Sequence, residues 1–203
     1  MKTISKEKKK FVHGCILKGA ISAAVNTRSQ KNPVYSLSRI ERSIKAELVS
    51  FWKEKLVEYA TNYIKEKKDS QYFITDVLKF QSDINKSFKD CFYNNEGIRI
   101  AQCQKSLSVY LKWLWCLGEL KYEPPVCPID RYVLSECRRH SNEAQRAIID
   151  KVNKDGGWGA INDPDTYEKL VAIIEDVSKS AAVWELFFYN REVLFSNNDY
   201  MKE

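Results

Sequence analysis

Glycine and proline are scarce in this sequence, with 7 and 5 copies among 203 residues. Sandwiches and barrels need many tight turns, so this scarcity argues against them and favours long helices. No apolar run approaches the roughly 20 residues that a membrane-spanning helix requires. The apolar part of the basic N-terminal segment is short and interrupted by Lys18, unlike a secretion signal. The sequence therefore predicts an all-α cytoplasmic protein without a membrane partner.

Residues that commonly bind metals are too few or too widely spaced to form a site. The two histidines, His13 and His140, lie far apart, and none of the six cysteines belongs to a Cys-x-x-Cys pair. This excludes the usual spacing of zinc ligands. Most of the cysteines fall at apolar helical positions, where we expect reduced thiols in a core. We expect no metal and no cofactor.

Apolar and positively charged side chains are plentiful. Hydrophobic residues make up 44% of the chain, enough for a sizeable core, and the formal net charge is +6. The positive excess is compatible with a polyanionic partner, and equally with an ordinary protein surface. Part of it gathers at the N-terminus, where a solvated end is the simplest interpretation: Lys2, Lys6, Lys8, Lys9 and Lys10.

Apolar residues recur at steps of three and four in several stretches, which indicates amphipathic helices. We expect these helices in the ranges 1–26, 35–64, 74–93 and 163–187. Residue types that favour helix starts predict caps, namely Ser36 or Ser38, Thr75, Ser141 and Asp163. The simplest organisation is one monomeric all-helical domain, residues 1–203, in one unit or in two lobes with a cleft, ending in a polar tail at 196–203.

The most apolar segment, residues 99–134, contains a helix, a break at Gly118, a Pro-Pro turn and a new helix start. Its first helix is apolar on almost every side, which is typical of a central helix packed on several sides. Lys105 stands near the start of this helix, and Asp130 at the expected N-cap of the next. If the connection brings the two starts together, an amine nucleophile and a carboxylate that can accept its proton would face one pocket.

Each of these residues also has an ordinary structural explanation. A lysine at the start of a buried helix often extends its amine to solvent, and an aspartate at an N-cap contributes about 1 kcal/mol of stability. Trp113 and Trp115 are suited to a core. The glycine-dense loop at 154–159 lacks the Lys-Ser/Thr ending of a phosphate-binding loop, so we interpret it as a turn.

The order of Gln104-Lys105, an apolar helix, a proline-containing loop and Pro128-Ile129-Asp130 resembles the helix–hairpin–helix DNA glycosylase superfamily, and within it the archaeal 8-oxoguanine DNA glycosylase branch. The resemblance covers mainly residues 97–134. The glycine-rich hairpin of the family is replaced by residues 95–103, where Gly97 is the remaining glycine. The resemblance implies a compact helical glycosylase fold and a double-stranded DNA partner with a modified or damaged base.

The resemblance also implies roles for individual residues. Lys105 would be the Schiff-base nucleophile and Asp130 the catalytic carboxylate of a base-excision enzyme with possible lyase activity, with Lys112 a second candidate for the nucleophile. The implied DNA-backbone contacts are Gly97, Arg99, Lys112 and Arg131, and the implied base pocket contains Tyr110, Trp113 and Trp115. Two other functions stay open, namely an inert helical nucleic-acid-binding module and a helical interaction or defence accessory protein.

Overall fold

The computed structural model describes residues 2–26, 33–36 and 40–190, and the regular structure in them is helical. Within these residues there is no strand; Tyr35 and Phe92 form an isolated antiparallel bridge. The predicted all-α class is therefore confirmed. The elements are α1 (Lys2–Val25), α2 (Arg42–Ala60), η1 (Thr61–Tyr63), α3 (Ser70–Phe88), η2 (Lys89–Cys91), η3 (Tyr93–Asn95), α4 (Ile100–Cys116), α5 (Arg131–His140), α6 (Glu143–Lys154), η4 (Trp158–Ala160), α7 (Pro164–Val177) and α8 (Ala181–Tyr189).

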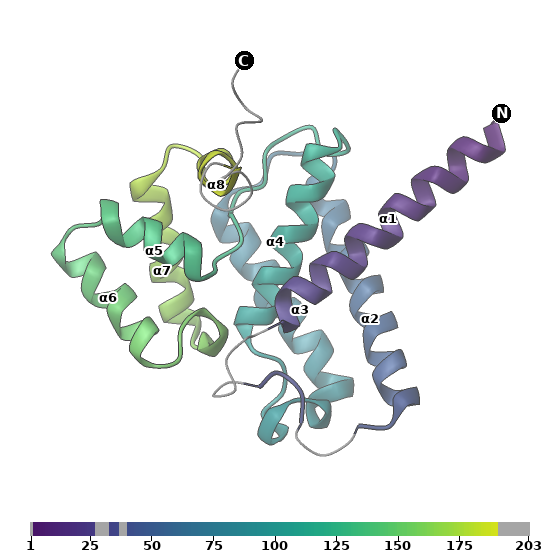
Figure 1. The fold of residues 1–203 in the computed structure, drawn as a ribbon, viewed down its shortest axis with the longest axis horizontal. Helices are drawn as coiled ribbons and strands as arrows, with labels where there is room; N and C mark the ends of the chain where they lie inside the picture. Colours follow the sequence, from purple (N-terminus) through teal and green to yellow (C-terminus); the bar gives the residue numbers. More distant parts are fainter. Residues whose placement is uncertain (1, 27–32, 37–39, 191–203) are drawn as a thin grey trace.

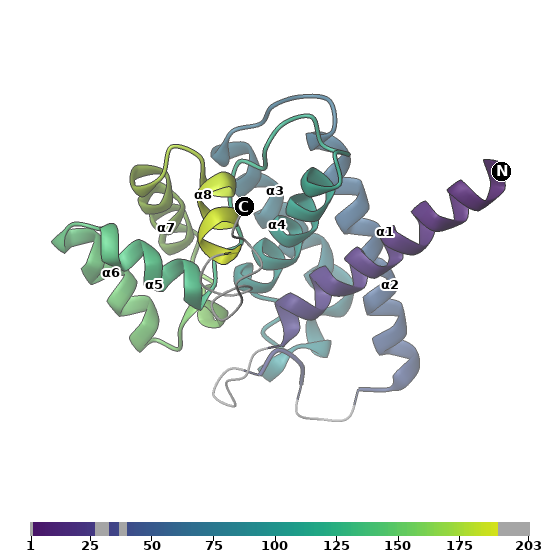
Figure 2. The same ribbon diagram turned by 45° about the horizontal axis from the view of Figure 1, so that its top comes forward.

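The helices lie in two groups that share one core. Figures 1 and 2 show α1 to α4 on one side and α5 to α7 on the other, with α8 between them. The buried apolar side chains of both groups belong to one contiguous cluster, which extends from Ile16 in α1 to Phe188 in α8. Helix α1 crosses α4, and its N-terminal half extends beyond the rest of the molecule (Figure 1).

Helix α4 is the central element, as its all-round apolar pattern predicts. It packs against α1, α2, α3 and η4, and every residue from Ile100 to Leu111 is buried. Its buried polar side chains have partners; for example, the Ser106 hydroxyl accepts a hydrogen bond from Trp52 Nε1 at 3.1 Å. Helix α4 therefore holds polar groups inside the core without leaving them unpaired.

The start of α4 is closed by a loop from the other end of the chain. The Ile100 amide donates to Asn162 Oδ1 at 3.3 Å and the Ala101 amide to the Ile161 carbonyl at 2.9 Å. These contacts satisfy N–H groups that a helix N-terminus otherwise leaves unpaired. Helix α4 begins at Ile100, so Lys105 lies in its second turn. The sequence predicts Lys105 near the start of this helix, and these contacts place the first residue five positions before it.

Gly97 has a clear structural reason to be glycine. Its φ is +86°, and a Cβ there would collide with the side chain of Asn85. Asn85 Oδ1 accepts from the Ile98 amide at 2.7 Å, and Asn85 Nδ2 donates to the Ile98 carbonyl at 3.2 Å. These contacts fasten the segment before α4 to α3. Gly97 is buried, so its tight packing explains this glycine without a phosphate contact.

Two helix starts differ from the sequence prediction. Helix α2 begins at Arg42, because the preceding segment pairs with 91–93: the Ser36 amide donates to the Cys91 carbonyl at 3.0 Å. Ser36 therefore caps no helix, and Ser38 lies outside the described residues. Helix α3 begins at Ser70 rather than near Ile74, and the Asp69 carboxylate caps it by accepting from the Tyr72 amide.

Of two further cap predictions, the one for α6 is wrong and the one for α7 is confirmed. Asn142, in a capping box with Gln145, caps α6 in place of Ser141, whose hydroxyl donates to the Cys137 carbonyl. Asp163 caps α7, with Pro164 in its first turn, as predicted. The glycine-dense loop is a turn that leads into η4, also as predicted.

The predicted last helix is divided into two. Helix α7 ends at Val177, and α8 begins at Ala181, where Ser180 Oγ accepts from the Val183 amide. The changed direction leaves Phe187, the last residue of the predicted helix, 74% exposed. The predicted polar tail at 196–203 lies outside the described residues.

Four of the cysteines are buried and two, Cys15 and Cys116, are exposed; all six are free. Among the described residues, no helix is both long enough and apolar enough to cross a membrane. No group of three or more metal-binding side chains is present in the same part of the chain.

Candidate active site

Lys105 and Asp130 meet at the boundary between the two groups of helices. Lys105 Nζ donates to Asp130 Oδ2 at 2.5 Å. Both residues are buried, with Lys105 8% and Asp130 9% exposed. The amine therefore does not extend into bulk solvent, although a long lysine side chain commonly does. The structure brings together an amine and a carboxylate that are 25 residues apart in the sequence.

Several contacts fix the carboxylate of Asp130. Its second oxygen, Oδ1, accepts from the amides of Tyr132 and Val133 at 2.9 and 3.0 Å, which makes Asp130 the N-cap of α5. The partial positive charge at this helix start favours a negative group there. One carboxylate oxygen thus anchors the side chain, and the other faces the lysine.

Gln104 holds the segment that precedes Asp130. Its amide nitrogen donates to the Ile129 carbonyl at 2.8 Å, and its amide oxygen accepts from the Ile129 N–H at 3.1 Å. Both groups are buried, so water does not compete with these bonds. The residue beside Lys105 in α4 therefore ties down the residue beside Asp130.

A pocket of about 530 Å³ opens onto this ion pair. Its size lies within the range of roughly 300–1,000 Å³ that is usual for small-ligand sites. The lining comes from one face of α4, from two small residues of α1 and from the C-terminal part of α8. The lining residues are Gly19, Ala23, Lys105, Val109, Lys112, Trp113, Cys116, Pro128, Asp130, Glu185, Leu186, Tyr189 and Asn190.

A second ion pair lies in the same pocket. Lys112 Nζ contacts both carboxylate oxygens of Glu185, at 2.8 and 3.0 Å, and lies 4.8 Å from the centre of the Tyr189 ring. Burial raises the pKa of the Glu185 carboxyl above its ordinary value, and the charge of Lys112 opposes this rise. Burial likewise raises the pKa of the Tyr189 hydroxyl. Because Lys112 is two turns after Lys105, about 10 Å along the helix, the two pairs lie on the same face of α4.

The turn before α7 contributes an aromatic ring. Lys105 Nζ lies 5.6 Å from the centre of the Trp158 ring, a cation–π distance. Gly159, next to it, accepts through its carbonyl from Gln102 Nε2 at 3.4 Å, which holds η4 on α4. The glycines of this loop are compatible with a turn. Its tryptophan, Trp158, is the sequence signal that could have indicated a contribution to the site.

The three aromatic residues predicted for a base pocket are separated by the helix. Trp113 lines the pocket and is 49% exposed. Tyr110 and Trp115 do not line it; Tyr110 is 2% exposed, and burial raises the pKa of its hydroxyl. Trp115 is two positions after Trp113 and therefore lies on a different face of the helix. Tyr110 is three positions before Trp113, but it is buried in the core cluster.

The predicted DNA-backbone contacts also have different surroundings. Arg99 Nη1 donates to the Gly159 carbonyl at 3.4 Å, and Arg131 stacks on the exposed Tyr132 ring at 4.5 Å, next to Asp130. Lys112 lines the pocket, where it is paired with Glu185, rather than facing the outer surface. Arg131 is the member of this set that is exposed at the edge of the site.

Glu185, Tyr189, Trp158 and Gln104 were not predicted as site residues. Glu185 is an acidic residue inside an otherwise apolar helix, and Tyr189 follows it by one turn. A charged residue in such a run indicates a buried partner, and this was the available signal. The identity of the partner, Lys112, is visible only in three dimensions.

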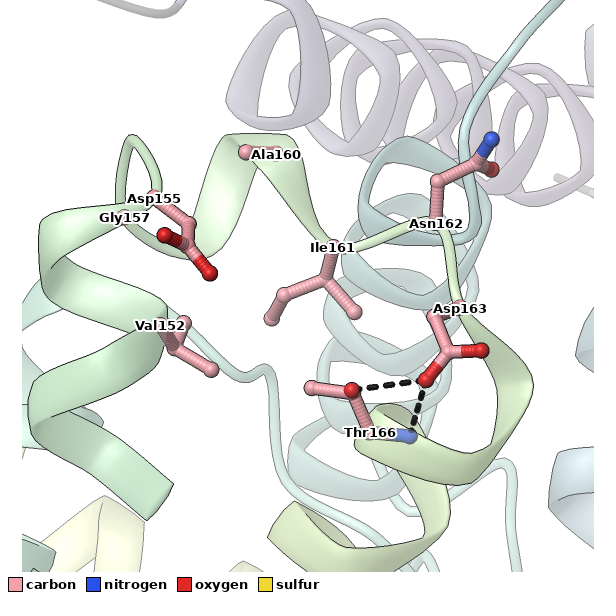
Figure 3. A pocket seen from close by; sticks show the side chains of 8 residues that line it. All are labelled: Val152, Asp155, Gly157, Ala160, Ile161, Asn162, Asp163 and Thr166. Carbon is pink, nitrogen blue, oxygen red and sulfur yellow. Dashed lines mark hydrogen bonds between the residues drawn. The ribbon is translucent and has the colours of Figure 1, made fainter. Parts of the chain in front are cut away.

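Figure 3 shows a smaller pocket, lined by the end of α6, the loop that closes α4 and the start of α7. Its volume is about 280 Å³. Asp163 there is occupied as a helix cap, accepting from the Thr166 amide and hydroxyl at 2.9 and 2.7 Å (Figure 3). None of the lining residues was predicted to act in catalysis or binding. The hydrogen bonds of Asp163 in this pocket are those of a helix N-cap.

Comparisons with models of known protein families, with curated proteins and with solved structures found no match. The function is therefore argued from the geometry of the pocket.

Proposed function

We propose that this protein is a DNA glycosylase that removes a modified or damaged base from duplex DNA, with Lys105 as its nucleophile and Asp130 as its carboxylate. The observation that carries the proposal is the hydrogen bond of 2.5 Å between Lys105 Nζ and Asp130 Oδ2 at a pocket of about 530 Å³. The resemblance of residues 97–134 to the helix–hairpin–helix glycosylases supports the same roles.

The pair is suited to displacement at a sugar carbon. An amine attacks only as the free base, and the hydrogen bond to Asp130 gives its proton a direct acceptor. Lys105 would then form a bond to C1′ as the bond between C1′ and the base breaks. The proton held by Asp130 would pass to the departing base, and the carboxylate restored in this way would stabilise the positive charge of the lysine–sugar adduct. Opening of the sugar ring yields an imine, which allows elimination of the 3′ phosphate and hence strand cleavage.

The shape of the pocket fits an extruded nucleotide. An enzyme that acts on a base in a duplex must move it out of the stack, at a cost of a few kcal/mol. With the sugar at Lys105, the base would extend along the face of α4 towards Lys112, Glu185 and Tyr189. A carboxylate and an ammonium at that end provide an acceptor and donors for the polar edge of a base.

The test is borohydride trapping on duplexes that each carry one modified base or one abasic site. Reduction of the imine links protein to DNA, so we expect a covalent product with the wild type and none with Lys105→Gln. Lys112→Gln is the matched control, because it removes the other lysine of the same pocket. Trapped product that persists in Lys105→Gln and disappears in Lys112→Gln would assign the nucleophile to Lys112.

Asp130→Asn separates a catalytic role from a structural one. Asparagine can still cap α5 through its side-chain oxygen, but it cannot accept a proton from the lysine. We expect this variant to keep the fold and to reduce trapping at least 100-fold. A variant that traps at the wild-type rate would show that the ion pair only joins α4 to α5.

A further inference from the structure

We propose that the projecting N-terminal part of α1, residues 5–12, is a basic arm that contacts the phosphate backbone of duplex DNA beside the pocket. This inference rests on the proposed function, because it assigns the arm to the DNA that the pocket would receive. It names an interaction surface in addition to the residues implied by the resemblance.

The basic arm is exposed along its whole length. Every residue from Ser5 to Val12 is exposed, and Ile16 is the first buried apolar residue of α1. The arm carries Lys6, Lys8, Lys9 and Lys10 against one acidic residue, Glu7. Figures 1 and 2 show it extending past the other helices in both views. A helix that projects with this charge fits a polyanion rather than a packing partner within the chain.

The arm is joined rigidly to the pocket wall. Gly19 and Ala23 of the same helix line the pocket, and Glu119 contacts Lys9 Nζ at 3.4 Å and His13 Nε2 at 2.9 Å where the helix leaves the body. A nucleic acid seated at Lys105 therefore has a fixed relation to the arm. No flexible linker separates the two.

The helical register places Lys8 over the side of α1 that faces the pocket. Lys8 precedes Gly19 by eleven residues, which is about three turns of 3.6 residues and a length of roughly 16 Å. Phosphates of one DNA strand are spaced by about 3.4 Å along the axis of the double helix. For a duplex that runs along α1, the arm is thus expected to contact phosphates about five nucleotides from the extruded base.

Duplex DNA fits the arm better than a lipid surface does. A helix that lies in a membrane interface needs a continuous apolar face, whereas residues 5–10 contain no apolar side chain and only Phe11 and Val12 follow them in the arm. Closely spaced lysines without such a face are typical of phosphate contacts that carry no sequence information.

The experiment measures binding of a duplex that contains one tetrahydrofuran abasic-site analogue, which cannot form an imine. Affinity is determined by fluorescence anisotropy across a series of salt concentrations for the wild type and for Lys6→Gln, Lys8→Gln and Lys10→Gln combined. We expect the slope of log affinity against log salt to become shallower by about 0.9 for each phosphate that the variant no longer neutralises, hence by up to about 2.7. Hydroxyl-radical footprinting should show weaker protection about five nucleotides to one side of the analogue.

The control combines Lys65→Gln, Lys79→Gln and Lys89→Gln, which lowers the formal net charge from +6 to +3 as the arm variant does. These exposed lysines lie around α3, away from the pocket lining. We expect a salt slope close to that of the wild type. Equal slopes for the arm variant and the wild type would overturn the proposal, as would equal reductions in both triple variants.

Two further results separate this proposal from the proposed function. Trapping by the wild type together with an unchanged slope in the arm variant would refute the arm alone. Absence of both trapping and DNA binding in the wild type would refute both. Binding to phosphatidylserine vesicles that is abolished in the arm variant, with DNA binding unaffected, would assign the arm to membranes instead.

Discussion

The side chain of Gln104 positions Asp130 without touching it. Its two hydrogen bonds to the Ile129 backbone, at 2.8 and 3.1 Å, join α4 to the segment that leads into α5. Ile129 is fully buried, so no water replaces these bonds when the glutamine is removed. A small displacement of a catalytic group can reduce a rate 100-fold, which makes this glutamine important to the proposed chemistry.

We predict that Gln104→Ala lowers the free energy of unfolding by about 2 kcal/mol, because it leaves a buried N–H and carbonyl unpaired. It should also slow borohydride trapping at least tenfold. Gln102→Ala is the control, since Gln102 is equally buried but its bond to Gly159 is longer, at 3.4 Å. Urea unfolding and single-turnover trapping measure the two effects. A destabilised Gln104→Ala protein that traps at the wild-type rate would contradict the positioning role.

The Lys112–Glu185 pair makes stability depend on pH. Burial raises the pKa of Glu185 in the folded protein above its ordinary value of 4.5, which applies to the unfolded chain. At a pH between the unfolded and the folded pKa, the folded protein therefore holds a proton that the unfolded chain releases. Stability from this group is therefore fully present below about pH 4.5 and declines as the pH rises through the folded pKa. Lys112 limits the decline by stabilising the carboxylate.

We predict that Lys112→Met lowers the free energy of unfolding by about 3 kcal/mol at neutral pH, because it leaves Glu185 buried without its cation. The loss should shrink as the pH falls towards 4.5, where the carboxyl becomes neutral. Combining it with Glu185→Leu should restore most of the stability and remove the pH dependence. Urea titrations at a series of pH values measure this. A loss that is constant with pH would contradict the assignment to Glu185.

At the scale of elements, α1 serves as both a packing helix and a pocket wall. It packs mainly on α4, and two glycines, Gly14 and Gly19, interrupt its sequence. A Cβ added at either position would meet no other atom within 4 Å. Glycine weakens a helix by roughly 0.5–1 kcal/mol relative to alanine. Both glycines lie within helix α1, but only Gly19 lines the pocket. Substitutions at the two positions therefore differ in whether the new side chain lies at the pocket.

We predict that Gly14→Ala and Gly19→Ala each raise the free energy of unfolding by about 0.5–1 kcal/mol. Replacing Gly19 by phenylalanine should instead fill the pocket and abolish trapping without unfolding the protein. Gly14→Phe is the matched control and should trap normally. Thermal denaturation and borohydride trapping report the two properties. Equal trapping by the two phenylalanine variants would mean that the DNA does not enter this pocket.

The whole molecule has one core beneath two groups of helices. Leu107 and Leu111 of α4 belong to the same buried cluster as Tyr167 and Leu170 of α7. The hydroxyl of Tyr167 has no hydrogen-bond partner in the described part of the chain, and burial raises its pKa well above the ordinary value. Shared burial of this kind couples the groups, because opening one exposes apolar surface on the other.

We predict that the two groups unfold together. Native-state hydrogen exchange should give the same opening free energy for the most protected amides of α3, α4 and α7, equal to the free energy from urea unfolding. Tyr167→Phe should raise stability slightly throughout, since it removes an unpaired buried hydroxyl. Faster exchange confined to α5, α6 and α7 would show that these helices form an independent unit.

Local patterns in the sequence determined the helical class, the central position of α4, and the caps at Asp130 and Asp163. These follow from residue spacing and from side chains that bond within their own turn, so they need no knowledge of the rest of the chain. The caps at Asp69 and Asn142 were missed although equally local, because neighbouring serines and threonines offered similar signals.

The pocket was decided by tertiary structure. Asn162 sets the first residue of α4 from 62 positions away, and Glu185 meets Lys112 across 73 positions. The break between α7 and α8 turns Glu185 towards Lys112 and Phe187 outward. Such contacts depend on which helix faces pack together, a global property of the core. The sequence alone therefore determined that the central segment has a lysine near the start of its first helix and an aspartate at the N-cap of its second. Only the packed chain decided that they meet in a pocket shared with a second ion pair.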